Sequence, residues 1–165
     1  MPWVRTADES LFVRLLYGTG VNTLASVFVV ASAAIIFALG ALHLLYTFRG
    51  TKLHPRDPEL RLKLEQAPLV LTRQTTMWKA WIGFNASHSY GALLFGAIYG
   101  YLALVHGALL FQSPFLLALG LLILIGYAFL GKRYWFSVPY RGILLASASY
   151  VIALVIVLAQ SLRQV

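Results

Sequence analysis

The sequence contains no cysteine and few charged residues. Asp, Glu, Lys and Arg make up 11% of the 165 residues, and only 5 residues are acidic. The absence of cysteine excludes disulfide bonds and thiol chemistry. The scarcity of charge excludes most soluble folds, because a typical soluble domain is about 25% charged. Apolar residues are abundant instead: 60% of the chain is hydrophobic and its mean hydropathy is +0.79, which predicts a protein surrounded mainly by lipid.

Three long stretches carry no Asp, Glu, Lys or Arg, namely residues 15–48, 80–131 and 142–162. A membrane-spanning helix needs about 20 apolar residues, so the first and third stretches hold one span each. The second stretch is long enough for two spans around a turn. The sequence therefore predicts an all-α integral membrane protein, an antiparallel four-helix bundle that forms a single transmembrane domain over residues 1–165.

Local signals mark the ends of these helices. The helices are expected at residues 22–48, 76–105, 114–131 and 140–162, with a loop at 49–75 after the first. Asn22 or Thr23 can cap the first helix, Thr76 can cap the second, and Pro114 suits the first turn of the third. We expect the first helix to be retained rather than cleaved as a signal peptide, because acidic residues precede it.

The first loop is predicted to contain a short helix. Asp57 is a typical N-cap, Pro58 suits the first helical position and Glu59 the first turn. Leu60 and Leu64 then recur at helical spacing, which indicates an amphipathic helix on the inner membrane surface. The alternative is a docking site for a soluble partner. Residues 10–17 are predicted to lie similarly on the outer surface.

The distribution of Lys and Arg predicts the orientation in the membrane. Seven of them lie between residues 49 and 79 and three between 132 and 141, against only Arg5, Arg14 and Arg163 on the other side. Because these residues resist translocation, both loops are expected in the cytoplasm and both termini outside. The cations lie beside helix ends, so we expect contacts with anionic lipid headgroups and no binding of nucleic acid.

Polar residues within the predicted spans are the most informative feature. At about 1.5 Å per residue, His88 lies about 13 Å beyond Lys79 and His43 about 9 Å before Arg49, so the two histidines share a similar depth. An imidazole or amide that faces lipid is unfavourable. His43, Asn85 and His88 should therefore point into the bundle or a hydrated cavity.

These residues have more than one interpretation. As structural elements, Asn85, Ser87 and His88 would form interhelical hydrogen bonds, while Gly91, Gly96 and Gly100 would let helices pack closely. As a site for a quinone or lipid, the ligand-binding residues would be His43, Asn85, Ser87, His88, Tyr90 and, at the mouth, Arg141. His43 and His88 could alternatively ligate a b-type haem, with Gly40 and Gly91 leaving room for the ring.

Catalysis is not expected. All five carboxylates lie in the N-terminal segment or the first loop, so no intramembrane Asp or Glu is available as a general acid, proton carrier or metal ligand. The leading hypothesis is a non-catalytic accessory subunit, or a lipid-contacting component, of a membrane assembly. Its partner would be another membrane protein or a second copy of the chain.

Residues 78–88 carry the motif W-x-x-W-x-G-F-N-x-S-H, and Arg133-Tyr134-Trp135-Phe136 with Pro139 forms a weaker second block. This pattern resembles a family of small, uncharacterised bacterial inner-membrane proteins with four predicted helices. The resemblance implies the four-helix architecture over most of the chain. It implies no activity, cofactor or partner.

Overall fold

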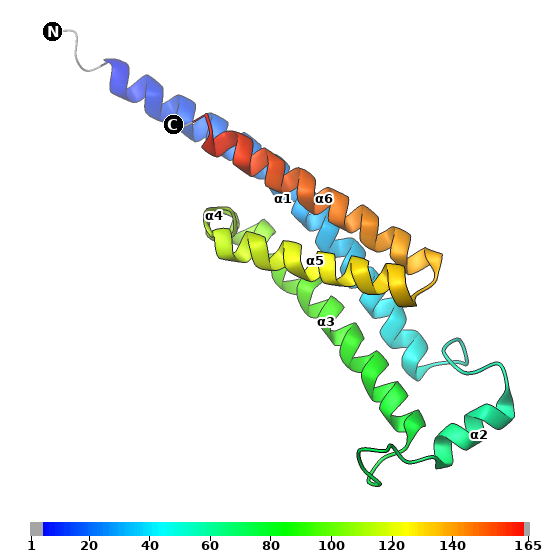
Figure 1. The fold of residues 1–165 in the computed structure, drawn as a ribbon. Coiled ribbons are helices and arrows are strands. Elements are labelled where there is room, and N and C mark those ends of the chain that lie inside the picture. Colours follow the sequence, from blue (N-terminus) through cyan, green and yellow to red (C-terminus); the bar gives the residue numbers. More distant parts are fainter. Residues whose placement is uncertain (1–4, 164–165) are drawn as a thin grey trace. The chain divides into compact units, whose positions relative to one another are not determined.

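The computed structural model describes residues 5–163, and the side chains of residues 23–163. In this part of the chain there are helices and no strands, apart from an isolated bridge between Pro68 and Thr76 (Figure 1). The helices are α1 Arg5–Phe48, α2 Pro58–Gln66, α3 Met77–Val105, α4 Gly107–Gln112, α5 Pro114–Tyr134 and α6 Ser137–Ser161. The predicted all-α class is confirmed.

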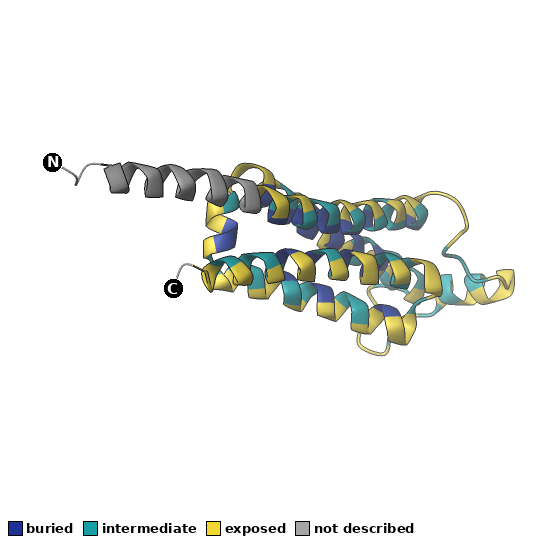
Figure 2. Cartoon of the chain, turned by 90° about the horizontal axis from the view of Figure 1, so that it is seen from above, coloured by how far each residue is buried: buried dark blue, intermediate teal, exposed yellow. Residues whose placement is uncertain are grey.

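Four helices are long and apolar enough to cross a membrane, as the uncharged stretches predicted. The candidate spans are Thr23–Phe48, Met77–Val105, Pro114–Tyr134 and Ser137–Ser161. Along each of them, buried positions recur between exposed ones (Figure 2). The exposed positions are largely apolar, which is the pattern expected of helices that pack on one side and face lipid on the other.

The helix ends differ from the sequence prediction in several places, and α6 begins at Ser137 rather than at residue 140. Helix α1 begins at Arg5, so Asn22 and Thr23 lie within it rather than at its cap. The side chains of the predicted surface segment 10–17 lie outside the described residues. Helix α4 occupies the predicted turn, and α5 continues through Gly131 to Tyr134. Gly131 lies inside α5 at a packing position, where a Cβ would lie 3.2 Å from the ring of Tyr140.

The short helix expected in the first loop is α2. The Asp57 side chain accepts a hydrogen bond of 2.9 Å from the Glu59 backbone N–H, and Pro58 occupies the first turn. This cap satisfies one of the N–H groups that have no partner inside the helix.

Two membrane-spanning helices are capped in a similar way. At the start of α3, the Thr76 hydroxyl accepts a hydrogen bond of 3.4 Å from the Lys79 N–H. At the start of α5, the Ser113 hydroxyl accepts a hydrogen bond of 3.3 Å from the Leu116 N–H.

The chain divides into two compact units. One comprises Met1–Ile35 with Phe95–Val165, and the other comprises Ile36–Leu94. The second unit holds the C-terminal part of α1, the first loop with α2, and the N-terminal part of α3. The prediction of a single transmembrane domain over residues 1–165 stays a prediction.

In the first unit, α5 and α6 pack against each other, and two tyrosines contact α5 at a glycine. The Tyr99 hydroxyl donates to the carbonyl of Leu116 over 2.7 Å, and the Tyr150 hydroxyl donates to that of Leu117 over 3.1 Å. Both rings lie over Gly120, where a Cβ would be 2.7 Å from the Tyr99 ring. The missing side chain therefore lets two buried phenols reach backbone carbonyls in an otherwise apolar core.

Candidate functional site

In the second unit, a hydrogen bond joins α1 to α3 at two of the polar positions that the sequence singled out. The distance between His43 Nε2 in α1 and Asn85 Oδ1 in α3 is 2.9 Å. Asn85 Nδ2 donates to the Trp81 carbonyl over 2.8 Å, which fixes the orientation of the amide. Asn85 Oδ1 is therefore the acceptor, and His43 carries a proton on Nε2. Asn85 is only 7% exposed, so this bond lies in the packed region between the helices.

His88 lies beside this hydrogen bond. Its ring centroid is 5.6 Å from that of His43, and the two planes meet at 82° in an edge-to-face contact. The structure thus brings together His43 and His88, which the depth estimate placed at a similar level, with Asn85, which was expected to point into the bundle. Packing of both imidazoles against each other shields their polar atoms from the surrounding apolar medium.

The hydroxyl groups of this region bond within their own helices. Ser87 donates to the Phe84 carbonyl over 2.9 Å, and Ser89 donates to the Asn85 carbonyl over 2.8 Å. In α1, Thr47 donates to the His43 carbonyl over 2.8 Å. Each bond returns to the preceding turn, a common way to satisfy a hydroxyl in a membrane helix.

Two more of the predicted ligand-binding residues, Tyr90 and Arg141, are exposed. Tyr90 is 57% exposed, and its hydroxyl has no hydrogen-bond partner among the described residues. Arg141 is exposed in α6, in the other compact unit. Of the three predicted packing glycines, Gly96 is buried, whereas Gly91 is exposed. A Cβ at Gly100 would lie 3.7 Å from that of Ala33, an ordinary contact.

The arrangement does not fit a haem ligated by the two histidines. Such a porphyrin would lie between the imidazoles, whereas these rings contact each other and His43 Nε2 is bonded to Asn85. The room expected beside Gly40 is filled by α3. A Cβ at Gly40 would lie 2.8 Å from the Ala92 Cβ and 3.1 Å from the Ser89 carbonyl oxygen. Gly40 therefore allows α1 and α3 to pack closely. The sequence did not predict this role, because it depends on which residues of α3 lie opposite Gly40.

No group of three or more His, Cys, Asp or Glu side chains that could hold a metal ion occurs among the residues described in the structure. Comparisons of the chain with protein-family models, with curated proteins and with solved structures give no match. The motif resemblance of residues 78–88 stays a prediction. Function is therefore inferred from the geometry of this multi-pass membrane protein itself.

Proposed function

We propose that the chain is a non-catalytic component of a membrane assembly, and that a partner's transmembrane helix packs against the outer side of α3. The partner is another membrane protein or a second copy of the chain. The docking surface, here called the outer α3 face, consists of Gly83, Ser87, Tyr90 and Gly91. The exposure of this polar and small-residue surface at membrane depth is the observation that carries the proposal.

The inward side of α3 supports a structural role. Asn85 uses its amide oxygen for His43 and its amide nitrogen for the Trp81 carbonyl. Ser89, which is fully buried, bonds to the Asn85 carbonyl. The His43–Asn85 bond joins α1 to α3, and the other two bonds lie within α3. Each of these groups is thus paired with another protein group, which favours the structural interpretation over a quinone or haem site.

The outer α3 face has the spacing of a close helix contact. Gly83, Ser87 and Gly91 are exposed and follow one another at intervals of four residues, so they lie on one side of the helix. A Cβ at Gly83 would meet nothing within 4 Å. Small residues at this spacing let a second helix backbone approach closely, which is the main source of attraction between helices in lipid.

Tyr90 adds a polar group that lipid cannot satisfy. It lies about 16 Å beyond Lys79 along α3, near the middle of the span. An unpaired hydroxyl in hydrocarbon is unfavourable, whereas a neighbouring helix offers carbonyl or side-chain acceptors. Docking of a partner would therefore stabilise Tyr90 and fill the space beside Gly83 and Gly91.

The proposed orientation places the first loop and the α5–α6 connection in the cytoplasm of a bacterium and both termini outside. Its support is the count of ten Lys and Arg residues in these connections against three on the other side. In the same orientation, the aromatic residues Trp78, Trp81 and Trp135 lie near the inner interface.

The mass of the protein in a gentle detergent tests the assembly. The wild type is expected to purify as a species heavier than the monomer, measured by light scattering coupled to size exclusion. The double variant Gly83→Leu and Gly91→Leu should reduce it to the monomer, because two leucines hold a second helix away from α3. A matched control is Ala118→Leu, at an exposed position of α5, which should leave the mass unchanged.

A wild type that is monomeric both in gentle detergent and in native membranes contradicts the proposal. An assembly that survives Gly83→Leu and Gly91→Leu contradicts the outer α3 face as its contact surface. The far-ultraviolet circular dichroism of each variant shows whether its helices are retained.

A further inference from the structure

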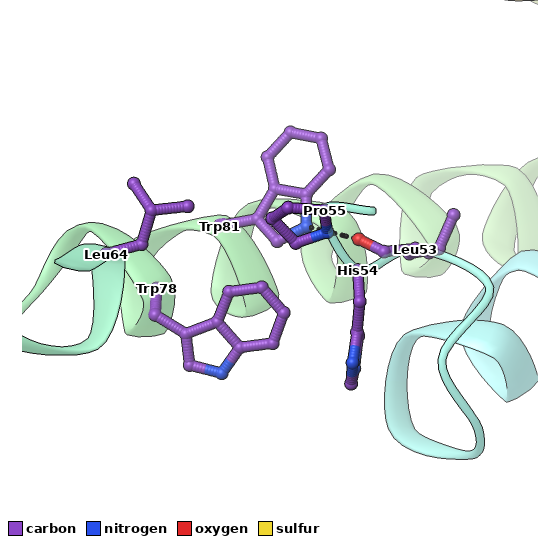
Figure 3. A pocket seen from close by; sticks show the side chains of 6 residues that line it. All are labelled: Leu53, His54, Pro55, Leu64, Trp78 and Trp81. Atoms are coloured by element: carbon purple, nitrogen blue, oxygen red, sulfur yellow. Dashed lines mark hydrogen bonds between the residues drawn. The ribbon is translucent and has the colours of Figure 1, made fainter. Parts of the chain in front are cut away.

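A second cluster of side chains lies in the first loop, at the ends of the membrane helices. A pocket of about 300 Å³ is lined by Leu53, His54, Pro55, Leu64, Trp78 and Trp81 (Figure 3). The loop supplies the first three residues, α2 supplies Leu64, and α3 supplies the two tryptophans. The Trp81 Nε1–H donates to the Leu53 carbonyl over 3.2 Å, so the loop is tied to α3 beside the pocket.

One cation is held in place over the apolar wall of this pocket. The Arg61 guanidinium lies 5.1 Å from the centroid of the Trp78 ring. Its Nε donates to Glu65 over 3.0 Å, and its Nη1 donates to His54 Nδ1 over 2.9 Å. An arginine fixed by three neighbours loses little freedom when it binds an anion, and cation–π contact leaves its N–H groups available.

One donor of this cluster remains available. The Nη2 group of Arg61 has no hydrogen-bond partner among the described residues. His54 Nδ1 accepts a bond from Arg61 Nη1 and so helps to hold the guanidinium in place. The His54 ring contacts Trp78 edge to face, with centroids 4.9 Å apart. An indole wall and an anion-binding donor thus lie next to each other.

The position of the pocket in the chain indicates what surrounds it. Helix α1 ends at Phe48 and α3 begins at Met77, so the pocket residues lie at the level where these spans leave the hydrocarbon. Tryptophan prefers this interface. Another cation lies there, with Lys52 Nζ 4.0 Å above the Tyr46 ring. Residues 49–79 carry seven Lys and Arg and three Asp and Glu, which favours an anionic ligand.

We propose that this pocket binds one anionic phospholipid. The lipid phosphate lies against Arg61 Nη2, while the glycerol and the start of an acyl chain cover Trp78, Trp81 and Leu64. Guanidinium binds phosphate in a directional manner, and indole and leucine surfaces suit the apolar part. The lipid site uses a different surface from the outer α3 face and does not depend on that proposal.

Native mass spectrometry of the full chain in detergent tests the site. Phosphatidylglycerol and phosphatidylcholine with identical acyl chains are titrated separately. One phosphatidylglycerol is expected to bind about tenfold more tightly than phosphatidylcholine, since hydrogen bonds to a net negative headgroup are the stronger ones. Millimolar inorganic phosphate should not displace the lipid, because it lacks the apolar part that contacts the tryptophans.

Matched variants locate the binding. Arg61→Gln should remove most of the preference for phosphatidylglycerol, whereas Arg73→Gln, an exposed cation of the same loop, should keep it. Trp78→Leu should weaken binding of the lipid, whereas Phe84→Leu, at an exposed position of α3, should not. Circular dichroism confirms that each variant retains its helices.

Three outcomes overturn the proposal. The first is equal binding of phosphatidylglycerol and phosphatidylcholine by the wild type. This result needs no variant, so it counts even if Arg61→Gln does not fold. Equal losses in Arg61→Gln and Arg73→Gln would show diffuse attraction by the loop charge rather than a site. Displacement of the lipid by inorganic phosphate would assign the Arg61 donor to a free anion instead.

Discussion

At the scale of single residues, the bond between His43 and Asn85 is the main polar link between α1 and α3 in the second unit. Its two partners are separated by 42 positions in sequence, and the Asn85 amide is held on its other side by Trp81. A buried amide that loses its partner in an apolar environment is destabilised by desolvation as well as by the lost bond. Interhelical bonds in membranes contribute about 0.6 kcal/mol on average and up to about 1.7 kcal/mol.

The substitution Asn85→Ala should lower the free energy of unfolding by about 1 kcal/mol, because His43 Nε2 loses its acceptor. Reversible unfolding in mixed micelles, titrated with a denaturing detergent and followed by circular dichroism, measures this change. Ser87→Ala is the control. Ser87 is exposed and bonds within its own turn, so its removal should have little effect.

A double-mutant cycle with His43→Ala and Asn85→Ala separates the pair from other effects of each substitution. The double variant should be destabilised by less than the sum of the two single effects, because either substitution alone already removes the bond. Additive effects of the two substitutions would show that the two side chains contribute independently, and the bond would then have no stabilising role.

The proximity of His43, Asn85 and His88 could be anticipated from the sequence. Counting from Lys79 and Arg49 gives the depth of each residue, and polar side chains at one depth on antiparallel helices tend to meet. The role of each atom could not be anticipated. Whether an imidazole contacts a ligand, an amide or another imidazole depends on how each helix is rotated about its axis and where the helices approach closely, as they do at Gly40.

At the scale of helices, a single glycine of α5 is the contact point for two other helices, α3 and α6. Tyr99 from α3 and Tyr150 from α6 both reach carbonyl groups of α5 over Gly120. Their rings are 5.9 Å apart and meet at 76°. Any side chain at Gly120 competes with these rings for the same space, so the contact depends on glycine for steric reasons rather than for backbone flexibility.

The substitution Gly120→Ala should destabilise the protein by about 1–3 kcal/mol, because a Cβ would lie 2.7 Å from the Tyr99 ring and force the rings and α5 apart. Gly126→Ala in the same helix is the matched control. A Cβ there meets nothing within 4 Å, so this substitution should be neutral or slightly stabilising. Unfolding titrations in mixed micelles measure both.

If Gly120→Ala and Gly126→Ala changed the free energy of unfolding alike, the tyrosine contact over Gly120 would not hold α5 in place. A loss confined to Gly120→Ala, with tyrosine fluorescence altered as well, is the expected result.

The helices themselves follow from the sequence more directly than their contacts do. Uncharged stretches give the four spans, and Asp57 with Pro58 gives α2, because these signals act over a few neighbouring residues. The helical conformation of residues 107–112 was missed, since His106-Gly107 is typical of a turn. The packing of Gly131 against Tyr140 was also missed, because it depends on residues from two helices.

At the scale of the whole molecule, the four candidate spans and the asymmetry of charge support the proposed topology. In that proposal the two ends of the chain lie on one side of the membrane, and the Lys- and Arg-rich connections on the other. The lipid site in the first loop requires these connections to face a leaflet that contains anionic lipid. The assembly through the outer α3 face requires only that α3 crosses the membrane.

Labelling of single introduced cysteines tests the topology most directly, and the cysteine-free chain suits it. Gln74→Cys and Ser137→Cys probe the two basic connections, and Gln112→Cys probes the opposite side; all three positions are exposed. A membrane-impermeant maleimide added to intact spheroplasts should modify Gln112→Cys alone, and should modify the other two only after lysis. Modification of Gln74→Cys or Ser137→Cys in intact spheroplasts would contradict the account.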